Sequence, residues 1–158
     1  DYYASRGLGD VYKRQSEDDA EKFVEVQNKS FYSDYLKYGM CPGYGRNAEE
    51  ISEAMKNNFV FKIVADKELV GKIGVKQIKD DEYHVNCLCI IPEYENKRIG
   101  QKAIAFIEKQ FPHAKKWSLE TPADKLRNHY FYKKCGYKIV DKMIDGTVEL
   151  VVFEKEIS

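Results

Sequence analysis

The stretch CLCIIPEYENKRIGQKAIAFIEK, residues 87–109, decides the fold of this chain. It begins with a continuous apolar run, passes through a polar and basic turn, and ends in a segment whose apolar residues recur with the period of a helix. The pattern predicts a buried central strand, a turn and an amphipathic helix that Pro112 ends.

The basic turn has the features of an anion site. A helix N-terminus carries unsatisfied backbone N–H groups and about half a positive charge, which suits a phosphate. Lys97, Arg98 and Lys102 add positive charge, and Gly100 would let a ligand approach the backbone closely. A pyrophosphate site is one interpretation, and an ordinary strand-to-helix turn with a solvated basic rim is the other. The turn matches neither a Walker loop nor the dinucleotide motif G-x-G-x-x-G.

Helices and strands alternate on both sides of this stretch. Helices are predicted from an N-cap at Ser16 to Phe31, after an N-cap at Asn47, and over residues 126–135, which Gly136 closes. Strands are predicted at residues 58–66, 69–79, 83–91, 115–121, 137–144 and 147–157. This order predicts a single mixed α/β domain, with a mostly antiparallel central sheet flanked by about four helices.

Composition limits the possible functions. The 158 residues suit one domain, and 26 basic against 26 acidic residues give no general electrostatic case for nucleic acid or an anionic membrane. No apolar run is long enough for a membrane span and there is no secretory signal, so we expect a cytoplasmic protein, monomeric or homodimeric. The four cysteines and three histidines lack metal-ligand spacing, which favours buried reduced thiols and predicts no metal.

The first fifteen residues have neither helical nor strand period. They resemble translated adapter sequence, so we expect residues 1–15 to be a non-native leader and residues 16–158 to be the domain, with a frayed N-terminus as the alternative. This leaves open whether a native first strand is missing, a place that residues 11–14 could fill by chance.

Two motifs resemble those of the GNAT N-acetyltransferases. The first motif is similar to the family's acetyl-CoA motif Q/R-x-x-G-x-G/A: it consists of a strand, PEY, a basic turn, IG and an amphipathic helix. Gly100 matches the last glycine of the motif. Two positions differ, because Glu95 stands at its first residue and Arg98 at its first glycine. NHYFYKKCGY, residues 128–137, is similar to the family's late helix, with Tyr132 four residues before Gly136. The order of elements from residue 16 to 158 fits as well. The chain is identified as a member of this family, and it resembles uncharacterised enzymes of low-GC Gram-positive bacteria.

The resemblance implies the site as well as the fold. The sheet is expected to splay beside its central strand, where acetyl-CoA, the co-substrate, would pair with Leu88 and Ile90. Its pyrophosphate would rest on the amides of Arg98, Ile99, Gly100, Gln101 and Lys102, with a side-chain contact from Lys97 or Arg98. Arg98 fits this role only if its backbone does not need a positive φ. Asn128 would hydrogen-bond the cofactor.

The implied reaction is direct attack of a primary amine on the thioester in a ternary complex. The amide of Ile90 or Ile91 would stabilise the oxyanion, Tyr132 would protonate the leaving thiolate, and Glu120 would be the base. Each side chain has a plainer interpretation, because Tyr132 could be a core residue and Glu120 a solvated strand-end carboxylate. A catalytically silent acetyl-CoA-binding module for sensing or assembly is the alternative function.

The acceptor is predicted to be a small-molecule or peptide amine. In this family the first helices and their loop shape the acceptor site, and here that region is aromatic. Phe31, Tyr32 and Tyr35 would line a pocket in which Asp34 attracts a cationic amine. The alternative is that these aromatic side chains pack the helix onto the sheet.

Overall fold

One eight-stranded sheet organises the chain, in the order β1–β2–β3–β4–β5–β6–β8–β7. This computed structural model describes residues 2–4, 11–14 and 19–158. The strands are β1 (Tyr2–Ala4), β2 (Val11–Arg14), β3 (Phe59–Ala65), β4 (Glu68–Lys79), β5 (Glu82–Ile90), β6 (Lys116–Pro122), β7 (Lys138–Asp145) and β8 (Val148–Glu156). The helices are α1 (Ala20–Tyr38), α2 (Ala48–Lys56), α3 (Ile99–Gln110) and α4 (Leu126–Lys134), with a 3₁₀ turn, η2 (Pro92–Tyr94), before α3.

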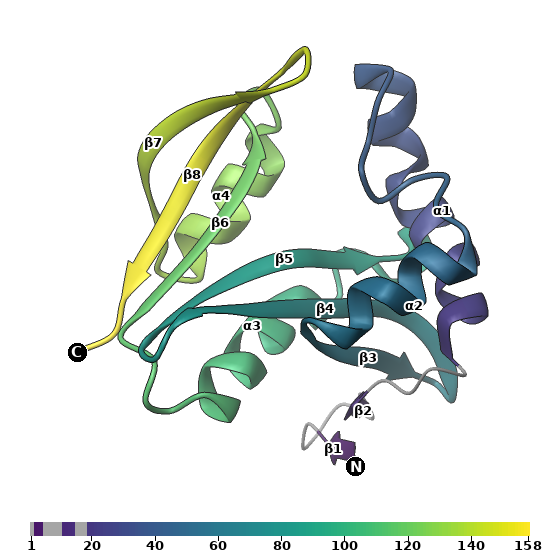
Figure 1. The fold of residues 1–158 in the computed structure, drawn as a ribbon, viewed down its shortest axis with the longest axis horizontal. Helices are drawn as coiled ribbons and strands as arrows, with labels where there is room; N and C mark the ends of the chain where they lie inside the picture. The colour runs from purple at the N-terminus through teal and green to yellow at the C-terminus, as the bar shows by residue number, and fades with distance from the viewer. Residues whose placement is uncertain (1, 5–10, 15–18) are drawn as a thin grey trace.

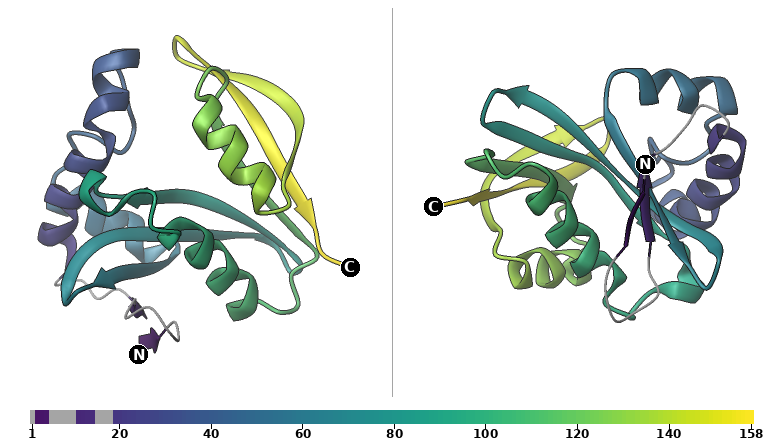
Figure 2. Two further views of the ribbon diagram at one scale, coloured as in Figure 1. Left: turned by 180° about the vertical axis from the view of Figure 1, so that it is seen from behind. Right: turned by 90° about the horizontal axis from the view of Figure 1, so that it is seen from below.

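The helices cover both faces of the sheet. Helices α1 and α2 lie on one face, whereas α3 and α4 lie on the opposite one (Figures 1 and 2). Buried side chains join the layers, since Phe23 of α1, Ile73 of β4 and Ile107 of α3 are all fully buried. The mixed α/β domain that the periodicity predicts is therefore confirmed.

Local signals explain several element boundaries. Asn47 caps α2 in a reciprocal capping box with Glu50, as its position in the sequence predicts. Gly136 takes a φ of 96°, a left-handed conformation that suits the residue after α4. Helix α1 is longer than expected, because it continues to Tyr38 and ends at Gly39. The predicted N-cap at Ser16 lies outside the described residues, and Asp19 holds the N-cap position.

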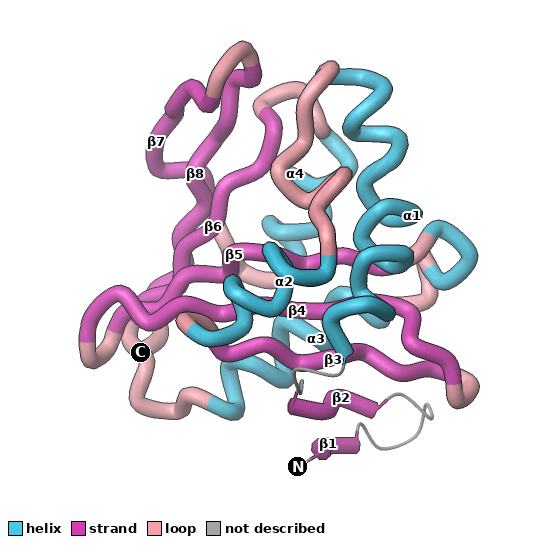
Figure 3. Tube along the Cα trace, turned by 45° about the vertical axis from the view of Figure 1, so that its right-hand side comes forward, coloured by secondary structure: helices cyan, strands magenta, loops and turns pink. Residues whose placement is uncertain are grey.

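Strands β5 and β6 are paired only over a short distance. They run parallel and pair residue by residue from Glu82 with Lys116 to His84 with Ser118. Beyond that point β5 stays with β4, whereas β6 follows β8, so the sheet divides into two arms (Figure 3). This is the splay that the resemblance implies, and it lies beside the predicted central strand.

The N-terminal strands extend the opposite edge of the sheet. Strand β2 pairs antiparallel with β3, and β1 pairs with β2. Residues 11–14 thus occupy the place next to β3 that a first strand was expected to fill. The interpretation of residues 1–15 as a non-native leader stays a prediction.

Candidate active site

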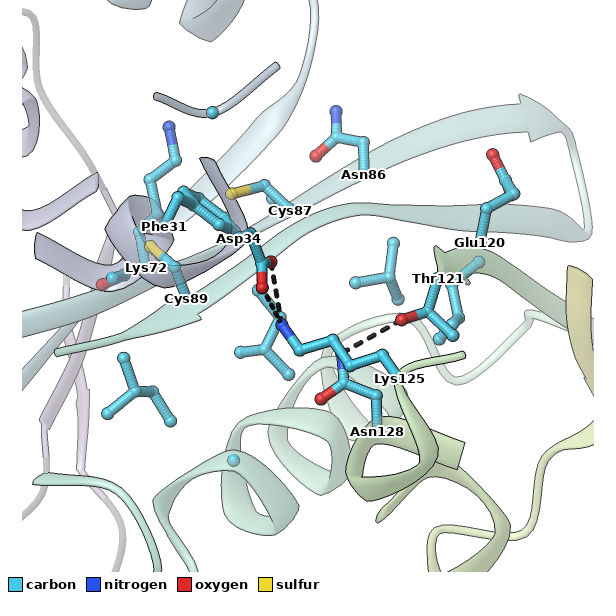
Figure 4. A pocket seen from close by; sticks show the side chains of 18 of the residues that line it. Phe31, Asp34, Lys72, Asn86, Cys87, Cys89, Glu120, Thr121, Lys125 and Asn128 are labelled. Carbon is cyan, nitrogen blue, oxygen red and sulfur yellow. Dashed lines mark hydrogen bonds and ion pairs between the residues drawn. The ribbon is translucent and has the colours of Figure 1, made fainter. Parts of the chain in front are cut away.

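A cleft opens where the two arms of the sheet part. Its cavity has a volume of about 890 Å³ and is lined by residues from α1, β4, β5, the start of α3, β6 and α4. Figure 4 shows Lys72 and Cys87 at one end, Glu120 at the other, and Asp34 with Lys125 between them. The cleft therefore joins segments that are far apart in the sequence.

One wall of the cleft is an unpaired backbone edge. The Ile91 N–H donates to the Val70 carbonyl oxygen at 2.8 Å, so Ile91 bonds toward β4. Successive residues of an antiparallel strand direct their backbone groups to opposite sides, so Leu88 and Ile90 direct theirs away from β4. The described sheet has no strand paired with them on that side. The Ile91 amide is already bonded to Val70, so it is not available to stabilise the oxyanion. Of the two predicted oxyanion donors, only the Ile90 amide is retained.

The N-terminus of α3 closes one end of this wall. The Lys102 N–H donates to the Arg98 carbonyl oxygen at 3.2 Å, the first hydrogen bond of the helical ladder. The Lys102 amide is therefore already bonded, which corrects the prediction that it holds a pyrophosphate. Gly100 and Gln101 precede the helical hydrogen-bond ladder, and both line the cleft. Among the other predicted cofactor residues Arg98, Ile99 and Asn128 line it too, and Lys97 does not.

Arg98 takes a left-handed backbone conformation, with φ at 65°. The condition set from the sequence, that the Arg98 backbone does not need a positive φ, is therefore not met. The loop keeps the conformation that a glycine would adopt there, at a cost of about 1–2 kcal/mol for a side chain with a Cβ. The amide-rich turn is thus formed by backbone shape, whatever side chain stands at this position.

Of the two departures from the family motif, Glu95 has a structural partner. Glu95 accepts a hydrogen bond from Arg127 of α4 at 2.9 Å, which ties the loop before α3 to α4. The Lys97 ammonium lies 4.8 Å from the centre of the Tyr94 ring. Gly100 is close to protein rather than to open space, because a Cβ there would lie 3.0 Å from the Phe131 ring. Its small size serves the packing of α3 against α4.

Tyr132 lies in the cleft wall and is buried to 8% exposure. Its ring packs against Phe131 and Phe153, with centroids 5.0 and 5.6 Å away. Burial is the main cause that raises the pKa of the Tyr132 phenol well above its ordinary value. The phenol therefore stays protonated at neutral pH, which is the state that a proton donor needs.

Glu120 has a partner that the sequence did not suggest. Its Oε2 lies 2.7 Å from His84 Nε2, at the point where β5 and β6 separate. Glu120 lines the cleft, and His84 lines a smaller hollow beside it that shares Asn86 with the cleft. Asn86 is the extra residue of a β-bulge, since Cys87 pairs with Gly74 and Val85 with Val75. Bulges commonly redirect side chains near active sites.

Helix α4 adds a polar pair. The Asn128 amide donates from Nδ2 to Thr121 Oγ1 at 3.0 Å, and both residues line the cleft (Figure 4). His129 is turned away, since its Nε2 lies 3.0 Å from the Pro122 carbonyl oxygen and its ring packs on Phe153.

The predicted acceptor residues divide into two groups. Phe31 and Asp34 line the cleft, whereas Tyr32 and Tyr35 are 51% and 41% exposed and are not part of its wall. These two tyrosines pack on Tyr44, with Tyr35 stacked at 4.4 Å, and so belong to the outer surface of α1. Their assignment to an acceptor pocket is corrected, because helical spacing turns them away from the sheet.

Asp34 is already paired. Both of its carboxylate oxygens accept hydrogen bonds from Lys125 at 2.8 Å, which links α1 to the loop between β6 and α4. Tyr38 makes a second link, since its hydroxyl donates to Asp124 at 2.6 Å. The negative charge that was expected to attract a cationic amine is thus balanced within the protein.

The polar residues of the cleft that the sequence did not indicate as site residues include Arg46, Lys72, Asn86 and Cys87. Lys72 belongs to an apolar stretch of β4 and is 7% exposed. The pKa of Cys87 is lowered to about 7, chiefly by a hydrogen bond from Cys89 and further by the charges of Lys72 and Arg46, against the effect of burial. The signal in the sequence was a lysine inside an apolar strand.

The described residues contain no group of three or more His, Cys, Asp or Glu side chains that could hold a metal ion. None of their helices combines the length and the apolar character needed to cross a membrane. The described cysteines form no disulfide.

Comparisons with known proteins agree with this geometry. The model of the acetyltransferase (GNAT) family matches residues 14–137, and no curated protein matches the sequence. The PaiA N-acetyltransferase from Thermoplasma acidophilum, in complex with coenzyme A, has a TM-score of 0.75 at 23% identity, covering 95% of this chain and 100% of its own. The ribosomal-protein-S18-alanine N-acetyltransferase from Escherichia coli has a TM-score of 0.75 at 10% sequence identity, and the match covers 94% of each chain. Aminoglycoside 6′-acetyltransferase type Ii has a TM-score of 0.72 at 20% sequence identity, and the match covers 93% of this chain and 97% of that protein.

Proposed function

Because the chain belongs to the acetyltransferase (GNAT) family and is an acetyl-CoA-dependent acyltransferase, we propose that it transfers the acetyl group directly to a primary amine. The observation that carries this proposal is the parting of β5 from β6 after His84. It leaves the backbone groups of Leu88 and Ile90 facing a cleft of about 890 Å³. An extended amide-containing chain can pair with such an edge as an additional strand does.

The cofactor fits the residues that surround this edge. Pantetheine would pair with Leu88 and Ile90, and the pyrophosphate would accept hydrogen bonds from the amides of Gly100 and Gln101. Arg98 and Asn128 are close enough to this part of the cleft to add side-chain contacts. A similar fold crystallised with coenzyme A supports the same ligand.

Three groups of this chain would serve the transfer. The Ile90 amide would stabilise the oxyanion, since it faces the cleft and is not used toward β4. Tyr132 would give its proton to the thiolate of the leaving coenzyme A. Glu120 would take the proton from the amine, with His84 holding its carboxylate in place at 2.7 Å. Positioned proton transfer of this kind contributes about 10²–10⁴-fold to a rate.

An amine acceptor agrees with the names of similar structures. One is named for an aminoglycoside and another for the alanine of a ribosomal protein, so the fold serves acceptors of very different size. In this chain the Asp34–Lys125 pair spans the middle of the cleft, which favours a small acceptor or an extended peptide end over a folded surface.

The proposal is tested by replacing Tyr132 with phenylalanine. The variant is expected to bind acetyl-CoA like the original chain, because its ring still packs in the wall, but to release coenzyme A at least about a hundredfold more slowly with an amine acceptor. Tyr35→Phe on α1 is the control, since Tyr35 is 41% exposed and lies outside the cleft, and it should keep its rate. Thiol release measures turnover, and thermal stabilisation by acetyl-CoA measures binding.

Each part of the proposal has its own contrary result. Stabilisation by acetyl-CoA without turnover on any amine would indicate the silent binding module instead. A Tyr132→Phe variant with an unchanged rate would remove the proton-donor role while leaving the transfer reaction in place. No stabilisation of a folded sample by acetyl-CoA or coenzyme A would contradict the cofactor site itself.

A further inference from the structure

Lys72 is a buried cation that no carboxylate of the described residues matches. Its side chain leaves β4 toward α1, where its Nζ lies 5.3 Å from the centre of the Phe23 ring, and the residue is 7% exposed. Among the described residues no carboxylate lies within ion-pair distance of it, although lysines such as Lys62 and Lys125 have one. A buried charge is costly unless it is paired, so such a residue in a cavity is a candidate for a ligand contact.

The acids that line the cleft cannot supply this partner. Asp34 is bonded to Lys125, Glu95 to Arg127 and Glu120 to His84. The remaining carboxylate of the wall, Asp145, belongs to the tip of the β7–β8 hairpin on the other arm of the sheet. The end of the cleft beside α1 and α2 is therefore left with uncompensated positive charge.

A second cation acts on the same spot. Arg46 lies in the loop between α1 and α2, lines the cleft and is exposed. Lys72 and Arg46 both lower the pKa of Cys87, after the larger effect of the hydrogen bond from Cys89. Two cations from different segments thus line the same cleft as Cys87, the residue that precedes Leu88 in β5.

We infer that the acceptor amine carries a carboxylate, which Lys72 and Arg46 bind at the α1–α2 end of the cleft. This inference rests on the proposed function and names the acceptor class, a small amino acid or a compound with the same pair of groups. The carboxylate would lie on the face of β5 opposite the N-terminus of α3. The amine would then lie between this anion site and Glu120, on the acceptor side of the thioester.

Matched acceptors test the inference by activity. Coenzyme A release is measured with a panel of L-amino acids, each beside its carboxamide, and with phosphoethanolamine beside ethanolamine. We expect at least one amino acid to have a higher kcat/KM than its carboxamide. We expect Lys72→Met to raise the KM for that amino acid by roughly tenfold to a hundredfold and to leave the KM for acetyl-CoA unchanged. Lys76→Met, an exposed lysine on the same strand and outside the cleft, should change neither constant.

A second test does not depend on turnover. Cys87 is alkylated with iodoacetate and with iodoacetamide, and the ratio of the two rates is compared with that at Cys41 by peptide mass spectrometry. Both reagents react with the thiolate, so the ratio of the iodoacetate rate to the iodoacetamide rate does not depend on how reactive the thiol is. The ratio instead measures how strongly the surroundings of the thiol attract a carboxylate. We expect it to be about tenfold higher at Cys87 than at Cys41 and to fall in Lys72→Met. Arg46→Gln, a change at an exposed residue, should lower it as well and serves if Lys72→Met does not fold.

The results separate the inference from the proposed function. Acetylation of amines without preference for the carboxylate, or a preference that survives Lys72→Met, would overturn the anion site and leave the transferase in place. A preference for phosphoethanolamine over all amino acids would replace the carboxylate by a phosphate and overturn the acceptor class. If no amine is acetylated, the transfer proposal fails, and an equal alkylation ratio at Cys87 and Cys41 would then overturn the anion site too.

Discussion

Arg98 occupies a backbone conformation that favours glycine. Its φ of 65° places it in the left-handed region, directly before the first residue of α3. The family motif has glycine here, and this chain keeps the same loop shape with a larger residue. We propose that its side chain adds positive charge beside the proposed pyrophosphate site.

Replacing Arg98 by glycine separates these two contributions. We expect the free energy of unfolding to rise by about 1 kcal/mol, because the strain at a positive φ disappears. Denaturant titration measures this change. If the guanidinium contacts the pyrophosphate, the same variant should bind acetyl-CoA more weakly although it is more stable.

Lys97→Gly is the matched control for this experiment. Lys97 is the preceding residue and has no positive φ, so glycine there should lower stability by roughly 0.5–1 kcal/mol through the entropy of the unfolded chain. Equal losses of stability in both variants would show that Arg98 is not strained.

At the scale of elements, the contact between α3 and α4 positions both halves of the site. Gly100 lies in the first turn of α3, and Phe131 precedes Tyr132 on α4. A Cβ at residue 100 would lie 3.0 and 3.1 Å from two carbons of the Phe131 ring, closer than side chains normally pack. The glycine thus sets how near the α3 amides come to the tyrosine.

Gly100→Ala is expected to destabilise the protein by about 1–2 kcal/mol, because overpacking outweighs the better helix propensity of alanine. In a Phe131→Leu background the ring is absent, and the same substitution should be neutral or stabilising. Thermal or denaturant unfolding of the four proteins measures this difference. Identical effects in both backgrounds would refute the packing explanation.

At the scale of the whole molecule, the protein is two arms of one sheet held at an angle. Their backbone pairing is limited to the start of β5 and β6. Side chains add a second junction across the cleft, where Asp34 and Tyr38 of α1 bind Lys125 and Asp124 of the loop before α4. The width of the cleft therefore depends on these polar contacts as well as on the sheet.

A double-mutant cycle on Asp34→Asn and Lys125→Met tests this junction. The side chains are 15% and 26% exposed, so we expect a coupling energy of about 1 kcal/mol in the free energy of unfolding. The pair Lys37–Asp124 joins the same elements but is 54% and 63% exposed, and its cycle should give only a few tenths of a kcal/mol. Equal couplings for the two pairs would contradict a specific role for the partly buried bridge.

Some parts of the site could be predicted from the sequence and others could not, depending on how far apart their residues lie in the chain. The residues of the cofactor end are neighbours in the sequence, so the strand, turn and helix of residues 87–109 could be recognised together. Asp34 and Lys125 are 91 residues apart, and His84 and Glu120 are 36 apart, so neither pairing leaves a local pattern. Tyr32 and Tyr35 were misassigned because composition does not indicate which face of a helix meets the sheet.

The sequence by itself determined the elements and the family, because periodicity, caps and glycine positions act within a few residues of the chain. Only the tertiary structure decided which charges are balanced, since an ion pair depends on strand register and on where a helix crosses the sheet. It shows that Asp34 is paired with Lys125 and that Glu120 lies against His84. It also shows that Lys72 is buried and that no carboxylate among the residues described by the structure pairs with it. The acceptor class that we infer rests on that balance of charge, which exists only once the two arms of the sheet have come together.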